Sequence, residues 1–144
     1  MDNSPKYDEE RIGAIRIDIR TYIQDLANLN IRDIQDLHDK RNFYAASMIL
    51  FSLLNRVFDL GSEVAVANNL GIPSTYREIF QVLENNGFIE FALARQMIRL
   101  VIYRNLLSHE YYGITDEKLI NLIRQMSTIE EFVSVMGGTI RESR

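Results

Sequence analysis

Cysteine is absent from this 144-residue chain, and proline occurs only twice. Without cysteine the protein can form neither disulfides nor thiolate metal sites. Two prolines and seven glycines leave long stretches without helix breakers, and no segment has a convincing strand pattern. We therefore expect an all-α fold, an up-and-down bundle of four to five helices, formed by one domain over residues 1–144.

Long apolar runs and an excess of positive charge are also missing. The longest stretch without charge, residues 42–55, is too short to cross a bilayer, and the first residues do not resemble a signal peptide. We therefore expect a cytoplasmic protein without membrane contact. The net charge of −4 argues against nucleic-acid binding over the whole surface, so any RNA contact must be local. Arg95, Arg99 and Arg104 recur at helical spacing and could form such a patch.

Apolar residues at spacings of three and four predict helices over residues 8–29, 34–68, 75–87, 90–108 and 115–136. The second is apolar on most sides from 43 to 60, so it should be central to the bundle or serve both a core and a subunit interface. Thr75 and Glu78 have capping-box spacing at the start of the third helix. Gly137-Gly138 should end the last helix and leave the tail 139–144 frayed.

The residues with the clearest chemical meaning lie at the end of the fourth predicted helix. They read Arg104-Asn105-x-x-x-His109-x-Tyr111 and include one of only two histidines. An arginine that holds phosphate charge and a histidine that moves a proton are what an RNase without a metal needs. Five residues correspond to about 140° around a helix, so Arg104 and His109 would not share a face. They can act together if the helix ends or bends between them, or if the groups come from two subunits.

This pattern resembles the signature of HepT-like toxins in the HEPN superfamily. The stretch from Gly71 to Phe80 and the later Gly87-Phe88-Ile89 are similar to the segment that precedes the signature in that family. Together the resemblance covers roughly residues 41–132. It implies an all-helical RNase toxin of a type II or type VII-like system, encoded beside a minimal nucleotidyltransferase antitoxin.

The resemblance also implies roles for individual residues. A homodimer would cleave RNA without metal or cofactor. His109 would act as a base on a ribose 2′-hydroxyl or as an acid toward the leaving 5′-oxygen. Arg104 would stabilise the charge on phosphorus, and Asn105 would orient the phosphate or the histidine. Tyr111 resembles the tyrosine that the antitoxin adenylylates, and the added AMP would compete with RNA phosphate beside Arg104. Occlusion by the partner is the alternative means of neutralisation.

The same residues also fit structural roles and a second function. An arginine or histidine near a helix C-terminus is often a favourable partner of the helix dipole or a cap. Tyr103 should be a packing residue and His38 a solvated surface residue, and no His and carboxylate cluster has metal-ligand spacing. The alternative function is a non-catalytic helical binding partner of a nucleotidyltransferase. The acidic net charge favours this alternative, whereas the complete Arg, Asn, His and Tyr set favours the nuclease.

Overall fold

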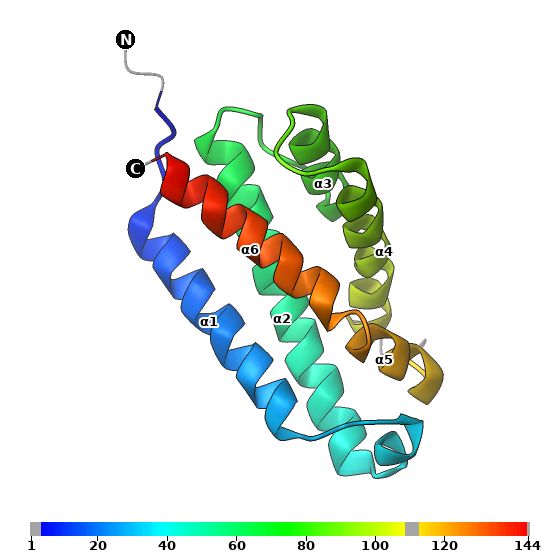
Figure 1. The fold of residues 1–144 in the computed structure, drawn as a ribbon. Coiled ribbons are helices and arrows are strands. Elements are labelled where there is room, and N and C mark those ends of the chain that lie inside the picture. Colours follow the sequence, from blue (N-terminus) through cyan, green and yellow to red (C-terminus); the bar gives the residue numbers. More distant parts are fainter. Residues whose placement is uncertain (1–3, 109–112, 144) are drawn as a thin grey trace.

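The computed structural model describes residues 4–108 and 113–143. This part of the chain is helical without any strand, which confirms the predicted all-α fold. The elements are α1 (Glu9–Asn28), the 3-10 helix η1 (Ile34–His38), α2 (Lys40–Ala67), α3 (Tyr76–Asn85), α4 (Phe91–Ser108), α5 (Asp116–Ile123) and α6 (Met126–Glu142). Figure 1 shows α2 through the middle of the bundle, with α1 along one side, α3 and α4 on the other and α6 crossing diagonally.

Helix α2 is the central element and contacts α1, α3, α4 and α6. Ten of its 28 residues are buried. By length and composition it could cross a membrane. Its apolar character is explained by the helices that pack around it, and its polar residues Arg56, Asp59 and Glu63 form ion pairs. Helix α2 therefore provides the rigid wall against which the other helices, and the site described below, are built.

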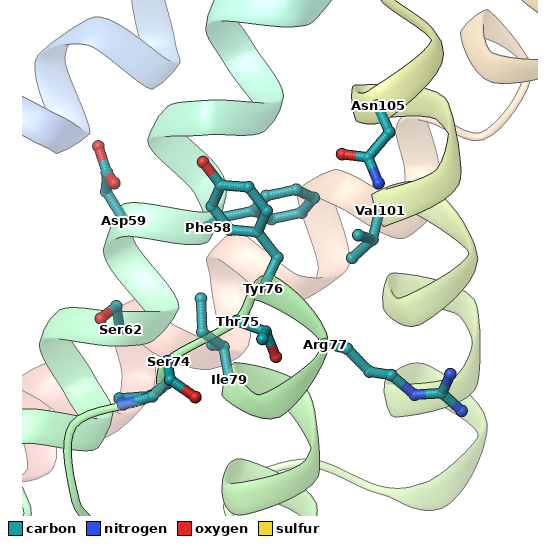
Figure 2. Close-up of a pocket in the computed structure, with 11 residues that line it drawn as sticks. Phe58, Asp59, Ser62, Ser74, Thr75, Tyr76, Arg77, Ile79, Val101 and Asn105 are labelled. Atoms are coloured by element: carbon teal, nitrogen blue, oxygen red, sulfur yellow. The ribbon is translucent and has the colours of Figure 1, made fainter. Parts of the chain in front are cut away.

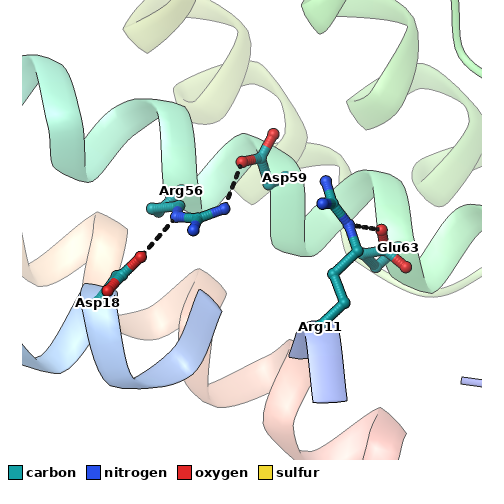
Figure 3. A network of polar contacts seen from close by, with 5 residues as sticks. All are labelled: Arg11, Asp18, Arg56, Asp59 and Glu63. Carbon is teal, nitrogen blue, oxygen red and sulfur yellow. Dashed lines mark hydrogen bonds and ion pairs between the residues drawn. The ribbon is translucent and has the colours of Figure 1, made fainter. Parts of the chain in front are cut away.

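Ion pairs join α1 to α2 along their polar edge (Figure 3). Arg56 donates to Asp18 at 2.8 Å and to Asp59 at 3.2 Å, and Arg11 pairs with Glu63. The hydrogen bond to Asp18 is the main cause that raises the pKa of Arg56 above its ordinary value. These groups are roughly one-third exposed, so each pair contributes less than about 1 kcal/mol. The buried isoleucines of α1, not these charges, hold the two helices together.

A chain of aromatic rings links three helices in the core. Phe58 of α2 meets Phe80 of α3 at 5.5 Å between ring centroids, and Phe80 meets Phe132 of α6 at 5.4 Å. Both pairs are edge-to-face, the favoured geometry, and all three rings are fully buried. Tyr76, the first residue of α3, lies against Phe58 at 5.1 Å and extends this chain toward the surface.

The predicted helix over 34–68 is wrong at its start, because the chain breaks at Asp39. Asp33 accepts from Gln35 N and caps η1, and Asp39, in an extended conformation, accepts from Arg41 N and caps α2. The apolar pattern predicts one continuous helix, but the two aspartates cap free backbone N–H groups and divide it into η1 and α2. Phe91, the first residue of α4, is 67% exposed, with its ring against the Arg95 guanidinium.

The expectations for the last helix also need correction. The segment 115–136 contains all of α5, a turn at residues 124–125 and the start of α6. Helix α6 then continues through Gly137-Gly138 to Glu142, so residues 139–142 are helical and not a frayed tail. Met136 and Ile140 are fully buried on either side of the glycines. Their burial outweighs the cost of about 1 kcal/mol that each glycine carries inside a helix.

Candidate functional site

The site begins at the C-terminal end of α4. Helix α4 is described as far as Ser108, the last described residue before His109, so the expected end or bend of the helix before His109 stays a prediction. Arg104 and Asn105 lie in the last two turns of α4. His109 and Tyr111 lie outside the described residues, and their predicted roles stay predictions.

Arg104 is held by side chains from two other helices. Its Nε donates to Oδ1 of Asn55 on α2 at 3.0 Å. Its guanidinium carbon lies 5.2 Å from the ring centroid of Phe51 and 4.8 Å from that of Tyr76 on α3. Each cation–π contact contributes about 0.5–2 kcal/mol, depending on how dry it is. The guanidinium is therefore fixed by a hydrogen bond at one edge and by two aromatic rings.

The positive charge of Arg104 has no carboxylate partner within the described part of the chain. Arg56 and Arg95, by contrast, each pair with at least one acid. To described residues, the terminal nitrogens of Arg104 make one long contact, from Nη1 to Oδ1 of Asn105 at 3.4 Å. A guanidinium has five N–H donors, so most of the terminal donors make no hydrogen bond within the described part of the chain and can meet a ligand. An unneutralised, oriented guanidinium is suited to an anion with two acceptor oxygens, such as a phosphate.

An open groove of about 470 Å³ lies between α2, α3 and α4, and it is lined by Asn105 and by Tyr76, the ring that Arg104 contacts. Figure 2 shows Asn105 pointing from α4 toward the rings of Tyr76 and Phe58, with Asp59 turned away on α2. The groove thus has an apolar floor, made by aromatic and aliphatic side chains, and a polar rim. The rim includes Arg77, which is exposed and has no ion pair to a described residue.

The start of α3 forms one wall of this groove and is firmly capped. Thr75 Oγ1 accepts from Glu78 N, as the capping-box spacing predicts, but the Glu78 carboxylate turns to Ser74 rather than to Thr75 N. It accepts from Ser74 Oγ at 2.7 Å and from Ser74 N at 3.2 Å. The hydroxyl bond first, and then the backbone bond, hold the pKa of Glu78 below its usual value. These bonds fix the position of Tyr76 at the first turn.

The other arginines of the predicted patch have different surroundings. Arg95 donates to Glu84 at 2.6 Å and lies over the Phe91 ring at 4.8 Å, so its charge is already engaged. Arg99 is exposed. Tyr103 packs against the core, as expected, and His38 is largely exposed, 3.8 Å from Asp116. No three or more His, Cys, Asp or Glu side chains cluster as a metal site within residues 4–108 and 113–143.

An exposed apolar strip runs along α2 toward Arg104. Tyr44, Met48 and Phe51 lie on one helix face at intervals of four and three residues, and we call them the α2 apolar stripe. Tyr44 is 65% exposed and Met48 is 72% exposed, whereas Phe51 is half-buried beneath Arg104. Phe58, seven residues after Phe51 on α2, is fully buried in the core.

Three residues of the site could not be assigned to it from the sequence: Phe51, Asn55 and Tyr76. The one available signal is Asn55, a polar residue in an otherwise apolar stretch of α2, in helical register with Phe51. Its partner Arg104 is 49 residues away in sequence, so only the packing of α4 on α2 reveals the pair.

The helical bundle defines the class of the protein, an all-helical HEPN-like fold. One similar solved structure is the tri-AMPylated Shewanella oneidensis HEPN toxin in complex with MNT antitoxin, at a TM-score of 0.80 and 19% identity. The match covers 89% of this chain and 97% of that one. A cytosolic protein of unknown function from Bacillus subtilis, YutE, matches with a TM-score of 0.79 at 17% identity, over 96% and 94% of the two chains. At these identities the likeness establishes the fold.

The family follows from the sequence comparison. A model of the family described as Ribonuclease HepT-like matches residues 19–136, and the chain belongs to this family. A curated relative is the mRNA nuclease HepT of Shewanella oneidensis (strain MR-1), 22% identical over 101 residues. That alignment covers 67% of this chain and 76% of the relative. The predicted resemblance to HepT-like HEPN toxins is thereby confirmed.

Proposed function

We propose that this protein is a metal-independent endoribonuclease and the toxin of a toxin–antitoxin pair in the cytoplasm. The observation that carries the proposal is Arg104, an oriented guanidinium without a carboxylate partner among the described residues, at the end of α4. Membership of the HepT-like ribonuclease family supports the same activity, and its curated relative is an mRNA nuclease.

The proposed reaction is an internal transesterification. His109 removes the proton of a ribose 2′-hydroxyl, and the 2′-oxygen attacks the adjacent phosphorus. Arg104 stabilises the charge that develops on the phosphoryl oxygens, and Asn105 orients the phosphate. The bond to the 5′-oxygen breaks as a general acid protonates that oxygen, leaving a 2′,3′-cyclic phosphate and a 5′-hydroxyl. The need for a 2′-hydroxyl restricts the reaction to RNA.

A homodimer would supply both proton-transfer groups, one histidine from each chain. The α2 apolar stripe is the surface that we assign to this contact, because it is exposed and leads to Arg104. In a two-fold dimer the same stripe pairs with itself and brings two copies of the site together. Met48→Glu should give a monomer in light scattering, whereas Ile17→Glu, which changes an exposed residue of α1, should not.

Beyond the scissile phosphate, RNA would contact exposed arginines near the groove. Arg99 and Arg77 are exposed and have no ion pairs to described residues, so they can meet further phosphates. Arg95 was part of the predicted patch, but its bond to Glu84 makes it the weaker candidate. Loss of one phosphate contact should reduce the slope of log binding constant against log salt concentration by about one.

A nucleotidyltransferase antitoxin is the proposed partner, and Tyr111 is the proposed AMP acceptor. A relative of the same fold is a tri-AMPylated toxin in complex with MNT antitoxin. An AMP on Tyr111 would place negative charge near Arg104, where it competes with RNA phosphate. Mass spectrometry after co-expression with such a partner should find AMP on Tyr111. Full neutralisation of Tyr111→Phe by a catalytically inactive partner would favour occlusion instead.

The direct test compares wild type with His109→Ala and Arg104→Ala. Wild-type protein should inhibit growth and cleave RNA with 2′,3′-cyclic phosphate ends in the presence of EDTA, and each variant should do neither while it stays folded. Intact RNA after incubation with wild-type protein, together with harmless expression, would favour the non-catalytic binding partner of a nucleotidyltransferase. The acidic balance of the chain is compatible with that second function.

A further inference from the structure

We propose that Asn55 and Tyr76 are positioning residues, which hold Arg104 in the orientation that cleavage requires. Neither residue belongs to the signature at the end of α4, and they come from α2 and α3. The inference rests on the proposed ribonuclease function. It adds that three helices build the site and that Arg104 cleaves RNA efficiently only when Asn55 and Tyr76 orient it.

Asn55 decides which edge of the guanidinium is available. It accepts the Nε–H of Arg104, which leaves the end-on edge, formed by the two terminal nitrogens, for the substrate. A neutral amide oxygen can do this without cancelling the positive charge, as a carboxylate would. The neighbours Leu54 and Val57 on α2 are fully buried, so the backbone beneath Asn55 cannot shift easily.

Tyr76 fixes the plane of the guanidinium. Its ring lies against Arg104 on one side of the site and against Phe58 of the core. The cap at Thr75 holds it at the first turn of α3. Its hydroxyl makes no hydrogen bond to the described residues, so the aromatic ring and not the hydroxyl should matter. Tyr76→Phe should therefore keep the cleavage activity, and Tyr76→Leu should lose it.

The experiment measures single-turnover RNA cleavage and, separately, the affinity for a 2′-O-methylated RNA that cannot be cleaved. Asn55→Ala should lower the cleavage rate about 10- to 100-fold with little change in affinity, because a misdirected guanidinium fails mainly in the transition state. Asn55→Asp should lower both rate and affinity while the melting temperature is unchanged or higher, because its carboxylate pairs with Arg104 and neutralises it.

Matched controls separate position from general damage. Asn42→Ala removes a half-buried asparagine of α2 that donates to the Asp36 carbonyl, about 20 Å along the helix from Asn55. Asn30→Asp adds the same charge at an exposed site between α1 and η1. Both should cleave at the wild-type rate. If either control loses activity as the Asn55 variants do, the effect is not local and the inference fails.

The Tyr76 pair gives the second arm. Tyr76→Phe should cleave RNA within about twofold of wild type, and Tyr76→Leu should lose about tenfold or more. Rates at the wild-type level in Asn55→Asp and Tyr76→Leu would overturn the inference and leave the ribonuclease proposal intact. A wild-type protein that neither cleaves RNA nor binds the methylated RNA would overturn both.

Discussion

At Gly61, α2 packs closely against side chains of α3 and α6, and replacement of this glycine tests how tightly the site is supported. A Cβ built on Gly61 lies 2.9 Å from Cγ2 of Ile79 and 3.1 Å from Cζ of Phe132. Ile79 is three residues after Tyr76 on α3. A methyl group at Gly61 would therefore push against the helix that positions the Tyr76 ring.

The magnitude follows from two opposing effects. Overpacking a core costs about 1–3 kcal/mol, and the upper half applies because Ile79 is β-branched and cannot turn away. Alanine instead of glycine inside a helix returns about 1 kcal/mol. We expect Gly61→Ala to lower the free energy of unfolding by about 1–2 kcal/mol, a fall in Tm of roughly 3–6 °C for a domain of this size.

Gly13 on α1 is the matched control, because a Cβ there meets nothing within 4 Å. Gly13→Ala should raise the free energy of unfolding by up to about 1 kcal/mol. Urea unfolding and thermal unfolding of both variants give the two differences. Stabilisation by Gly61→Ala, as expected for Gly13→Ala, would contradict the close packing of α2 on α3.

Three further predictions concern the core, the cap of α3 and the joint between α1 and α2. Phe80→Leu removes two edge-to-face contacts from a fully buried position and should cost about 1–3 kcal/mol in urea unfolding. The pKa of Glu78 is lower in the folded protein than its unfolded value of 4.5. The Glu78 carboxylate therefore stabilises the fold at pH values above 4.5, and this stabilisation is lost as the pH falls through the folded-state pKa. Glu78→Gln should therefore be less stable at neutral pH, and its Tm should depend less on pH over that acidic window; equal pH profiles would contradict the cap. Arg56→Met should cost at most about 1 kcal/mol, and less at high salt, in chemical unfolding.

Helix bounds could be predicted well where caps and apolar spacing agree. α1 and α3 begin and end close to the expected residues, and α4 begins close to its expected start, because Thr75 and the apolar periodicity indicate these bounds. The continuation of α6 through Gly137-Gly138 could not be predicted, because it depends on the burial of Ile140 among other helices. Local propensity opposes that continuation, and tertiary packing decides it.

The site could be predicted only in part for the same reason. Arg104 and Asn105 stand out in the sequence because they belong to a spaced pattern, and the structure places them side by side at the end of α4. The contacts of Arg104 with Asn55 and Tyr76 depend on how α2, α3 and α4 pack, which no local pattern records. The contribution of His109 and Tyr111 stays a prediction.

The most direct measurement of the central claim is the single-turnover RNA cleavage rate of Arg104→Lys beside that of wild type. Lysine keeps the charge but can neither present a planar fork to phosphate nor hold the same hydrogen bond to Asn55 against two rings. A loss of about 100-fold or more, in a variant with a wild-type melting temperature, is the predicted result. A lysine variant that cleaves RNA within about threefold of wild type would contradict the claim that the oriented guanidinium of Arg104 drives the reaction.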